Sequence, residues 1–203
     1  MKREPSGVGV LPGEYLAVLE TPTHQNTVSI EVRVDPRIEH DLDGMKAQYA
    51  ALKSLEKMTA VAAKAVKQLT ASKETLSEYQ KRLAKKDKEA HKELIDQCKS
   101  TSKEITTLVD LFLGKEDKRQ GIVRNPKSTV MTRIGLARRY AASRPSGLNS
   151  TENVLMEHAT TDVTAALKQV NNFYAETWPA LKTKIEAIDL SGFAPTKVFT
   201  LED

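Results

Sequence analysis

The sequence predicts a mainly α protein: an antiparallel bundle of long helices preceded by an N-terminal β-hairpin. Residues 8–37 carry strand-like patterns and turn signals, whereas nearly everything after them has the three-and-four spacing of amphipathic helices. The composition agrees, because aromatic residues make up only 5% and charged residues 29% of the 203 residues. Such a composition suits long, exposed helices better than a β-rich core.

Two strand-like segments predict the hairpin. Residues 14–21 are rich in β-forming residues, residues 22–26 resemble a turn, and residues 27–34 alternate between apolar and polar side chains. Because two strands bury too little surface to be stable alone in water, the hairpin must lie on the helices or pair with strands of another segment or chain, and we favour the second. A third strand is suggested only by the short segment 197–201. The candidate docking contacts are Val28, Ile30, Val32 and Val34.

Residues 42–112 are predicted to form two long helices that pack as an antiparallel coiled-coil hairpin. Apolar residues follow one another at intervals of three and four in both halves, and proline is absent from them. Threonine, serine and lysine interrupt this pattern at residues 70–74, where we place the turn. Cys98 lies on the apolar side of the second helix and is expected to be a small buried side chain rather than a nucleophile.

A short helix and a last long helix are predicted to complete the bundle. The short helix spans residues 128–142 and lies between loops at 114–128 and 144–147. The last helix begins at Asn149, because Glu152 three residues later gives the capping-box pattern.

Two divisions of the chain are expected. Pro179 lies inside the last helix, where its missing backbone N–H should kink the helix or divide it at Thr177–Trp178.

The hairpin and the bundle should be separate domains. Residues 1–37 would be the last strands of a β-sandwich, and residues 38–203 would be the helical bundle.

No catalytic, cofactor-binding or metal-binding residue is predicted, and the chain is not expected to be an enzyme. Glycine-rich phosphate loops do not occur in the sequence, and the acidic residues between positions 74 and 104 alternate with lysines, as on an exposed helix face. A single cysteine excludes a disulfide within this sequence. No histidine has a second ligand at helical spacing in a way that builds a metal-binding face, and all four are expected at the surface or flanks: His24, His40, His91 and His158.

A basic segment suggests an alternative function. The net charge of +4 is concentrated in residues 115–144, which carry nine basic and two acidic residues. Binding of a polyanion is therefore one alternative, with Arg133, Arg138 and Arg139 as its candidate patch. Tyr140 is the only aromatic residue of the segment and no nucleic-acid-binding motif surrounds it, so a solvated surface is favoured and nucleic acid is disfavoured as a partner.

The hairpin region resembles the end of an immunoglobulin- or fibronectin-like sandwich. This resemblance is carried by LPGEYLAVL at residues 11–19, with Tyr15 as the corner tyrosine, and by the Asp35-Pro36-Arg37 that follows the alternating strand. Together with the long helix that comes next, these residues are similar to the C-terminal region of secreted bacterial BNR-repeat or sortilin-type β-propeller proteins, known as glycosyl hydrolases and widespread in Bacteroidetes. In that family, a propeller precedes a small β-sandwich and a terminal helical bundle.

The resemblance implies an exported, non-catalytic structural or interaction module, located in the periplasm or at the cell surface. Its protein partner would be the upstream sandwich and propeller or a partner subunit. The sequence contains no Asp-box of the S-x-D-x-G-x-T-W type, so no catalytic residue is carried over.

A stand-alone coiled-coil adapter that self-associates into a homo-oligomer is the second alternative. The sequence shows no signal peptide, which keeps a cytoplasmic location open. It also contains no run of 18 apolar residues, so no membrane span is expected.

Overall fold

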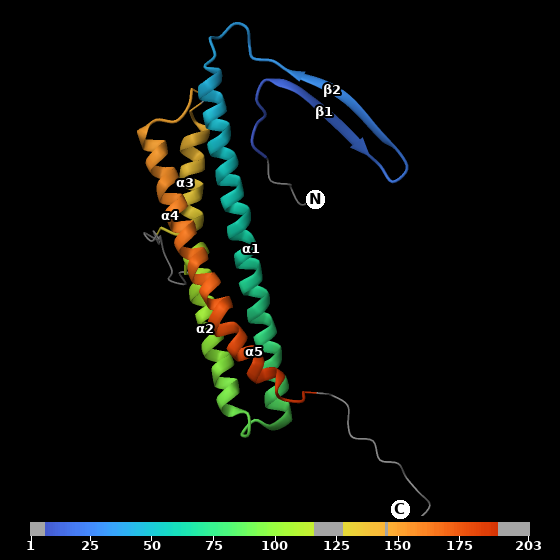
Figure 1. Cartoon of the computed structure of the whole chain (residues 1–203), viewed down its shortest axis with the longest axis vertical. Coiled ribbons are helices and arrows are strands. Elements are labelled where there is room, and N and C mark those ends of the chain that lie inside the picture. The colour runs from blue at the N-terminus through green and yellow to red at the C-terminus, as the bar shows by residue number, and fades with distance from the viewer. Residues whose placement is uncertain (1–6, 116–127, 145, 191–203) are drawn as a thin grey trace, which may run out of the picture. The chain divides into compact units, whose positions relative to one another are not determined.

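The predicted fold class is confirmed by the computed structural model, which describes residues 7–115, 128–144 and 146–190 (Figure 1). A two-stranded antiparallel sheet is followed by helices that account for most of the described residues. The suggested strand at 197–201 and most of the predicted loop at 114–128 lie outside the described residues. The elements are β1 (Gly13–Glu20), β2 (Gln25–Val32), α1 (Leu42–Asp87), α2 (Lys92–Leu113), α3 (Val130–Ala142), α4 (Ser150–Asn172), the π-helical turn η1 (Phe173–Thr177) and α5 (Trp178–Glu186).

The chain divides into two compact units. Unit 1 comprises residues 1–66 and 110–167, and unit 2 comprises residues 67–109 and 168–203. The helices α1, α2 and α4 each contribute residues to both units. The predicted domain boundary between residues 37 and 38 stays a prediction.

The hairpin of unit 1 has a regular register. β1 pairs antiparallel with β2, with Tyr15 opposite Ile30 and Ala17 opposite Val28. Directly opposed residues share a face of the sheet, so Val28 and Ile30 of β2 lie on the same face as Tyr15 of β1. The turn between the strands is closed by the backbone N–H of Thr21, which donates to the carbonyl oxygen of His24 at 2.8 Å.

The helices of unit 1 pack through small and branched side chains. Gln48 Nε2 of α1 donates to the carbonyl oxygen of Ala141 at the end of α3, at 2.8 Å. Arg133 of α3 pairs with Asp162 of α4, with 3.3 Å between Nε and Oδ2. The buried apolar residues of this unit are Ala51, Leu55, Ala62, Phe112, Val130, Ile134, Ala137, Ala141, Ala159, Val163 and Ala166.

Unit 2 has a core of its own. Lys73 Nζ of α1 donates to Thr106 Oγ1 of α2 at 2.7 Å, and Lys184 Nζ of α5 donates to Gln97 Oε1 of α2 at 3.0 Å. Cys98 is fully buried, which confirms its predicted role as a core side chain. The buried apolar residues are Leu69, Leu76, Leu83, Ile95, Cys98, Ile105, Leu108, Val170, Phe173, Leu181 and Ile185.

The predicted turn at residues 70–74 is wrong, because α1 is one continuous helix of 46 residues. Its most deeply buried residues recur every seven positions without interruption: Leu55, Ala62, Leu69, Leu76 and Leu83. Ser72 also faces inward, and its hydroxyl group is hydrogen-bonded to the Tyr174 hydroxyl at 2.9 Å. A polar residue with a partner does not end a helix, so the interruption in the apolar pattern was not a turn signal.

The helix instead ends at Asp87, within a run of charged residues. The Asp87 carboxylate accepts the backbone N–H of Ala90, three residues later, at 2.9 Å, a local side-chain bond that offers the backbone an alternative to the helix. Ala90 is therefore exposed in the connection to α2.

The predicted starts and breaks of the later helices are confirmed. Asn149 Oδ1 accepts the backbone N–H of Thr151 at 2.9 Å, while Glu152 accepts the N–H of Asn149 at 3.0 Å, which completes the capping box of α4. The division predicted from Pro179 falls between Thr177 and Trp178, where η1 ends and α5 begins. The wide π-helical turn accommodates Pro179, which has no backbone N–H to donate to a carbonyl oxygen of the preceding turn.

Candidate interaction surfaces

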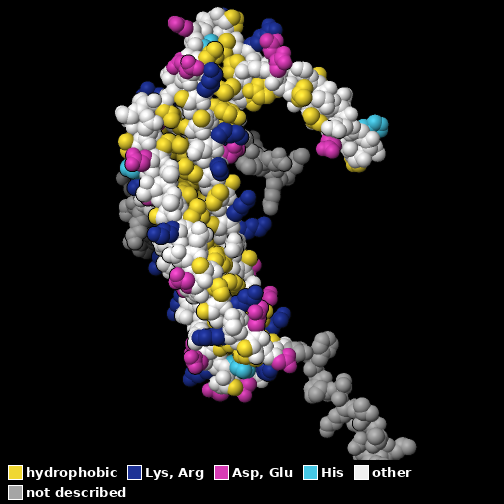
Figure 2. Space-filling model, in the orientation of Figure 1, with side chains coloured by type: hydrophobic (Ala, Val, Ile, Leu, Met, Phe, Trp, Pro, Cys, Tyr) yellow, Lys and Arg dark blue, Asp and Glu magenta, His cyan; other side chains and the backbone are white. Residues whose placement is uncertain are grey.

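The hairpin exposes apolar side chains on both faces. Every residue of β1 is exposed, and so is every residue of β2 before Val32. Of the predicted contacts, Val28 is 59% and Ile30 is 47% exposed, whereas Val32 and Val34 are half-buried. Val34 lies beyond the end of β2. Apolar side chains are visible along the hairpin in the space-filling view (Figure 2).

Tyr15 has the geometry of a tyrosine corner. Its hydroxyl group donates to the carbonyl oxygen of Leu11, four residues upstream, at 2.6 Å. In immunoglobulin-type sandwiches, a tyrosine at the start of the next-to-last strand makes the same kind of bond to upstream backbone. The bond therefore fits the sandwich-like pattern of this segment.

The Asp-Pro-Arg sequence forms a compact link between β2 and α1. The guanidinium of Arg37 donates to both carboxylate oxygens of Asp35, at 2.9 and 2.6 Å, and this interaction holds the pKa of Asp35 below its usual value. His40 Nε2 lies 2.8 Å from the carbonyl oxygen of Asp35. Asp41 then accepts the backbone N–H of Gly44 at 2.9 Å and caps the first turn of α1. These residues have a structural role at the start of the helix.

The three candidate residues for polyanion binding do not gather on one face. All lie on α3, where Arg138 and Arg139 follow Arg133 by five and six positions on a helix of about 3.6 residues per turn, so they point in different directions. Arg133 is engaged with Asp162, and the Arg139 guanidinium lies 5.7 Å from the ring centroid of Tyr140. Residues 116–127 of the basic segment lie outside the described part of the chain.

No metal-binding cluster of three or more His, Cys, Asp or Glu side chains is found within residues 7–115, 128–144 and 146–190. His24 and His158 are exposed, and His40 and His91 are half-buried at the ends of elements, as predicted. Burial raises the pKa of the Cys98 thiol, which disfavours the nucleophilic thiolate.

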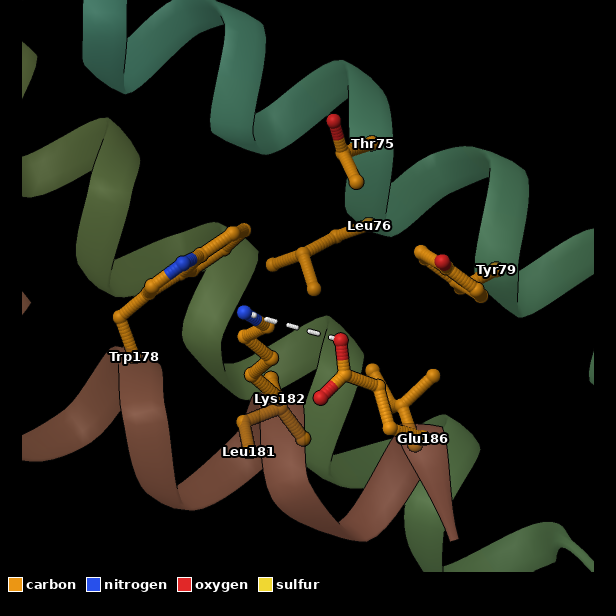
Figure 3. Close-up of a pocket in the computed structure, with 8 residues that line it drawn as sticks. Thr75, Leu76, Tyr79, Trp178, Leu181, Lys182 and Glu186 are labelled. Atoms are coloured by element: carbon orange, nitrogen blue, oxygen red, sulfur yellow. Dashed lines mark ion pairs between the residues drawn. The ribbon is translucent and has the colours of Figure 1, made fainter. Parts of the chain in front are cut away.

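A cavity of about 200 Å³ lies between α1 and α5 in unit 2 (Figure 3). The rings of Tyr79 and Trp178 form its walls. The sequence alone does not reveal this site, because Tyr79 and Trp178 both fit the apolar stripes of their helices and so have the pattern of core residues. The remaining lining residues are Thr75, Leu76, Leu181, Lys182, Ile185 and Glu186.

Trp178 belongs to an aromatic cluster around η1. Its ring centroid lies 6.2 Å from those of both Phe173 and Tyr174, which are themselves 5.0 Å apart in an edge-to-face arrangement. The hydrogen bond from Tyr174 to Ser72 links this cluster to α1. Burial raises the pKa of the Tyr174 hydroxyl above its ordinary value.

We expect Tyr174→Phe to lower the free energy of unfolding by about 1 kcal/mol near neutral pH, because the buried Ser72 hydroxyl loses its partner. The substitution should also change the pH dependence. The folded state holds the Tyr174 proton more tightly than the unfolded state, so wild-type stability falls as the pH rises above about 10. Urea unfolding of both proteins between pH 8 and 11 measures this difference.

The matched control for this prediction is Tyr140→Phe, which removes a hydroxyl group from an exposed tyrosine on α3. Its unfolding free energy should follow that of the wild type over the same pH range. Equal losses in the two variants would show that the Ser72–Tyr174 bond contributes nothing.

Comparisons with protein-family models, with curated proteins and with solved structures each gave no match. No helix in the described ranges is both long and apolar enough to cross a membrane.

Proposed function

We propose that this chain is a non-catalytic structural and interaction module whose hairpin supplies the last two strands of a β-sandwich that precedes it in the same polypeptide. The observation that carries the proposal is the hairpin, which is exposed on both faces and carries a tyrosine corner. In line with the sequence resemblance, we place that sandwich in an exported bacterial β-propeller protein, outside the cytoplasm.

The exposed hairpin face supports a partner that is itself a sheet. One face presents six apolar residues, and an isolated two-stranded sheet with such a face is marginal in water. Within the described ranges neither strand has a second neighbour, so both outer edges are open to further strands. The apolar residues of this face are Tyr15, Ala17, Leu19, Val28, Ile30 and Val32.

Amide hydrogen exchange combined with light scattering tests the proposal. We expect this chain to be a monomer whose hairpin amides exchange at least about 100-fold faster than those in the middle of α1, because no further layer covers them. In the same chain extended by the sequence its gene encodes upstream of Met1, the hairpin amides should become protected. In the extended chain, Ile30→Lys should abolish this protection, whereas Ser29→Lys, on the other face of β2, should retain most of it.

Three results would overturn the proposal. The first is a gene that encodes no upstream segment. The second is an extended chain in which the hairpin amides still exchange freely. The third is a dimer of this chain with protected hairpins, which would support the self-associating adapter instead.

A further inference from the structure

We infer that the cavity between α1 and α5 is a binding site for a small, neutral aromatic compound that carries one hydroxyl or N–H group, such as a phenol. This inference does not depend on the hairpin or on the proposed function. It follows from the size of the cavity, its aromatic walls and the charged pair at its mouth (Figure 3).

The size and floor of the cavity fit a single substituted ring. Leu76, Leu181 and Ile185 form an apolar floor and are all at least nine-tenths buried. An apolar cavity of about 150 Å³ accommodates benzene, so the volume of about 200 Å³ leaves room for a ring with one substituent. A ring between Tyr79 and Trp178 would have an aromatic face or edge on both sides, an arrangement that aromatic groups favour.

The walls are braced before any ligand binds. Trp178 is held by Phe173 and Tyr174, and Tyr174 is anchored to Ser72 on the opposite helix. The π-helical turn adds one residue before Trp178 and so turns its side chain about a quarter of a turn relative to a regular α-helix. On the other wall, the Arg82 guanidinium lies 5.8 Å from the centroid of the Tyr79 ring. Preformed walls reduce the ordering entropy that a small ligand must overcome.

The mouth selects a neutral ligand with one polar group. Lys182 Nζ and Glu186 Oε1 are 3.6 Å apart, which is an ion pair too long to be a good hydrogen bond. A ring hydroxyl between them accepts from the ammonium and donates to the carboxylate. The Lys182–Glu186 pair has no net charge, so its attraction and repulsion for a charged ring largely cancel. The cost of removing a charge from water then remains, and it favours a neutral ring.

The lone tryptophan makes the test direct, because Trp178 is the only tryptophan in the sequence and forms one wall. Titration with p-cresol, with excitation of Trp178 alone, should give a saturable change in emission with a Kd of about 1 mM or tighter. Cyclohexanol, which lacks the aromatic ring, and benzoate, which adds a charge, should each bind at least about 10-fold more weakly.

Two variants localise the site. Thr75→Phe adds a ring to the α1 side of the cavity lining, from an exposed position, and should weaken p-cresol binding at least about 10-fold. Ser77→Phe adds the same ring two residues away, on the opposite side of α1, and should leave the Kd unchanged. Circular dichroism confirms that both variants fold.

The inference is overturned if p-cresol gives no saturable change, if Thr75→Phe binds it as tightly as the wild type does, or if cyclohexanol binds equally well. Tighter binding of N-acetyltyrosinamide than of p-cresol would also overturn it, because the site would then belong to a tyrosine side chain of a protein partner.

Discussion

Replacing Phe112 by alanine is expected to lower the free energy of unfolding by about 3–5 kcal/mol. Phe112 is the largest of the fully buried side chains, with 0% of its surface exposed, and lies in the last turn of α2. Its truncation removes the transfer free energy of the ring and leaves a cavity that the surrounding helices fill only in part. Domains of this size are stable by about 5–15 kcal/mol, so the loss is a large fraction of the total.

The adjacent residue provides the control. Leu113 is 58% exposed on the same helical turn, so Leu113→Ala should change the unfolding free energy by no more than about 0.5 kcal/mol. Urea unfolding followed by circular dichroism measures the unfolding free energy of both variants. If the dependence of this free energy on urea concentration keeps the wild-type slope, the substitution has changed stability alone. Similar losses for the two variants would mean that Phe112 does not pack as the structure shows.

The parts of the fold that follow from local patterns were predictable from the sequence. Strict alternation at residues 27–34 gave the strand of the hairpin, and the Asn149–Glu152 spacing gave the start of α4. Pro179 predicted the division before α5, because its missing backbone N–H affects only the helical turn that contains it. Each of these signals is complete within about one or two turns of chain.

The turn after the first long helix was misplaced for two reasons: one residue has a partner that is distant in sequence, and the true turn lacks the usual turn residues. Ser72 looked like a break in the apolar pattern, because its hydrogen-bond partner, Tyr174, lies in a different helix. The true end of α1 depends on the Asp87 carboxylate and contains neither glycine nor proline, the residues that most often mark a turn.

The two candidate surfaces also differ in how far they could be predicted from the sequence. The exposed apolar residues Val28 and Ile30 could be selected from alternation alone, whereas the cavity beside Trp178 could not. Tyr79 and Trp178 come together only because α1 and α5 are neighbours in unit 2 and because η1 changes the direction of the tryptophan. In the sequence, a tryptophan on an apolar stripe looks the same whether it fills a core or borders a cavity.

Replacing Gly44 by alanine is the second change with a large expected effect, a loss of about 1–3 kcal/mol in the free energy of unfolding. Gly44 lies in the first turn of α1, where Ser146 and Gly147, which precede α4, come close to the helix. A Cβ atom at Gly44 would lie 2.5 Å from the carbonyl carbon and 2.6 Å from the oxygen of Ser146. Those are backbone atoms, so the loop itself must move. The approach is close from both sides, because a Cβ atom added at Gly147 would lie 3.1 Å from Gly44 Cα, and Gly147 has a positive φ of 94° that favours glycine.

Gly135→Ala is the matched control, because Gly135 also lies inside a helix, in α3, but a Cβ atom there meets nothing within 4 Å. Helix propensity alone favours alanine over glycine by about 0.5–1 kcal/mol at both positions. Gly135→Ala should therefore raise the unfolding free energy, while Gly44→Ala lowers it. Urea unfolding of the two variants measures the sign of each change. If Gly44→Ala is stabilising as well, the loop before α4 does not lie against the first turn of α1. Opposite signs for one chemical change would show that the close approach of Ser146 and of the Asp41 carboxylate, and not helix propensity, selects glycine at position 44.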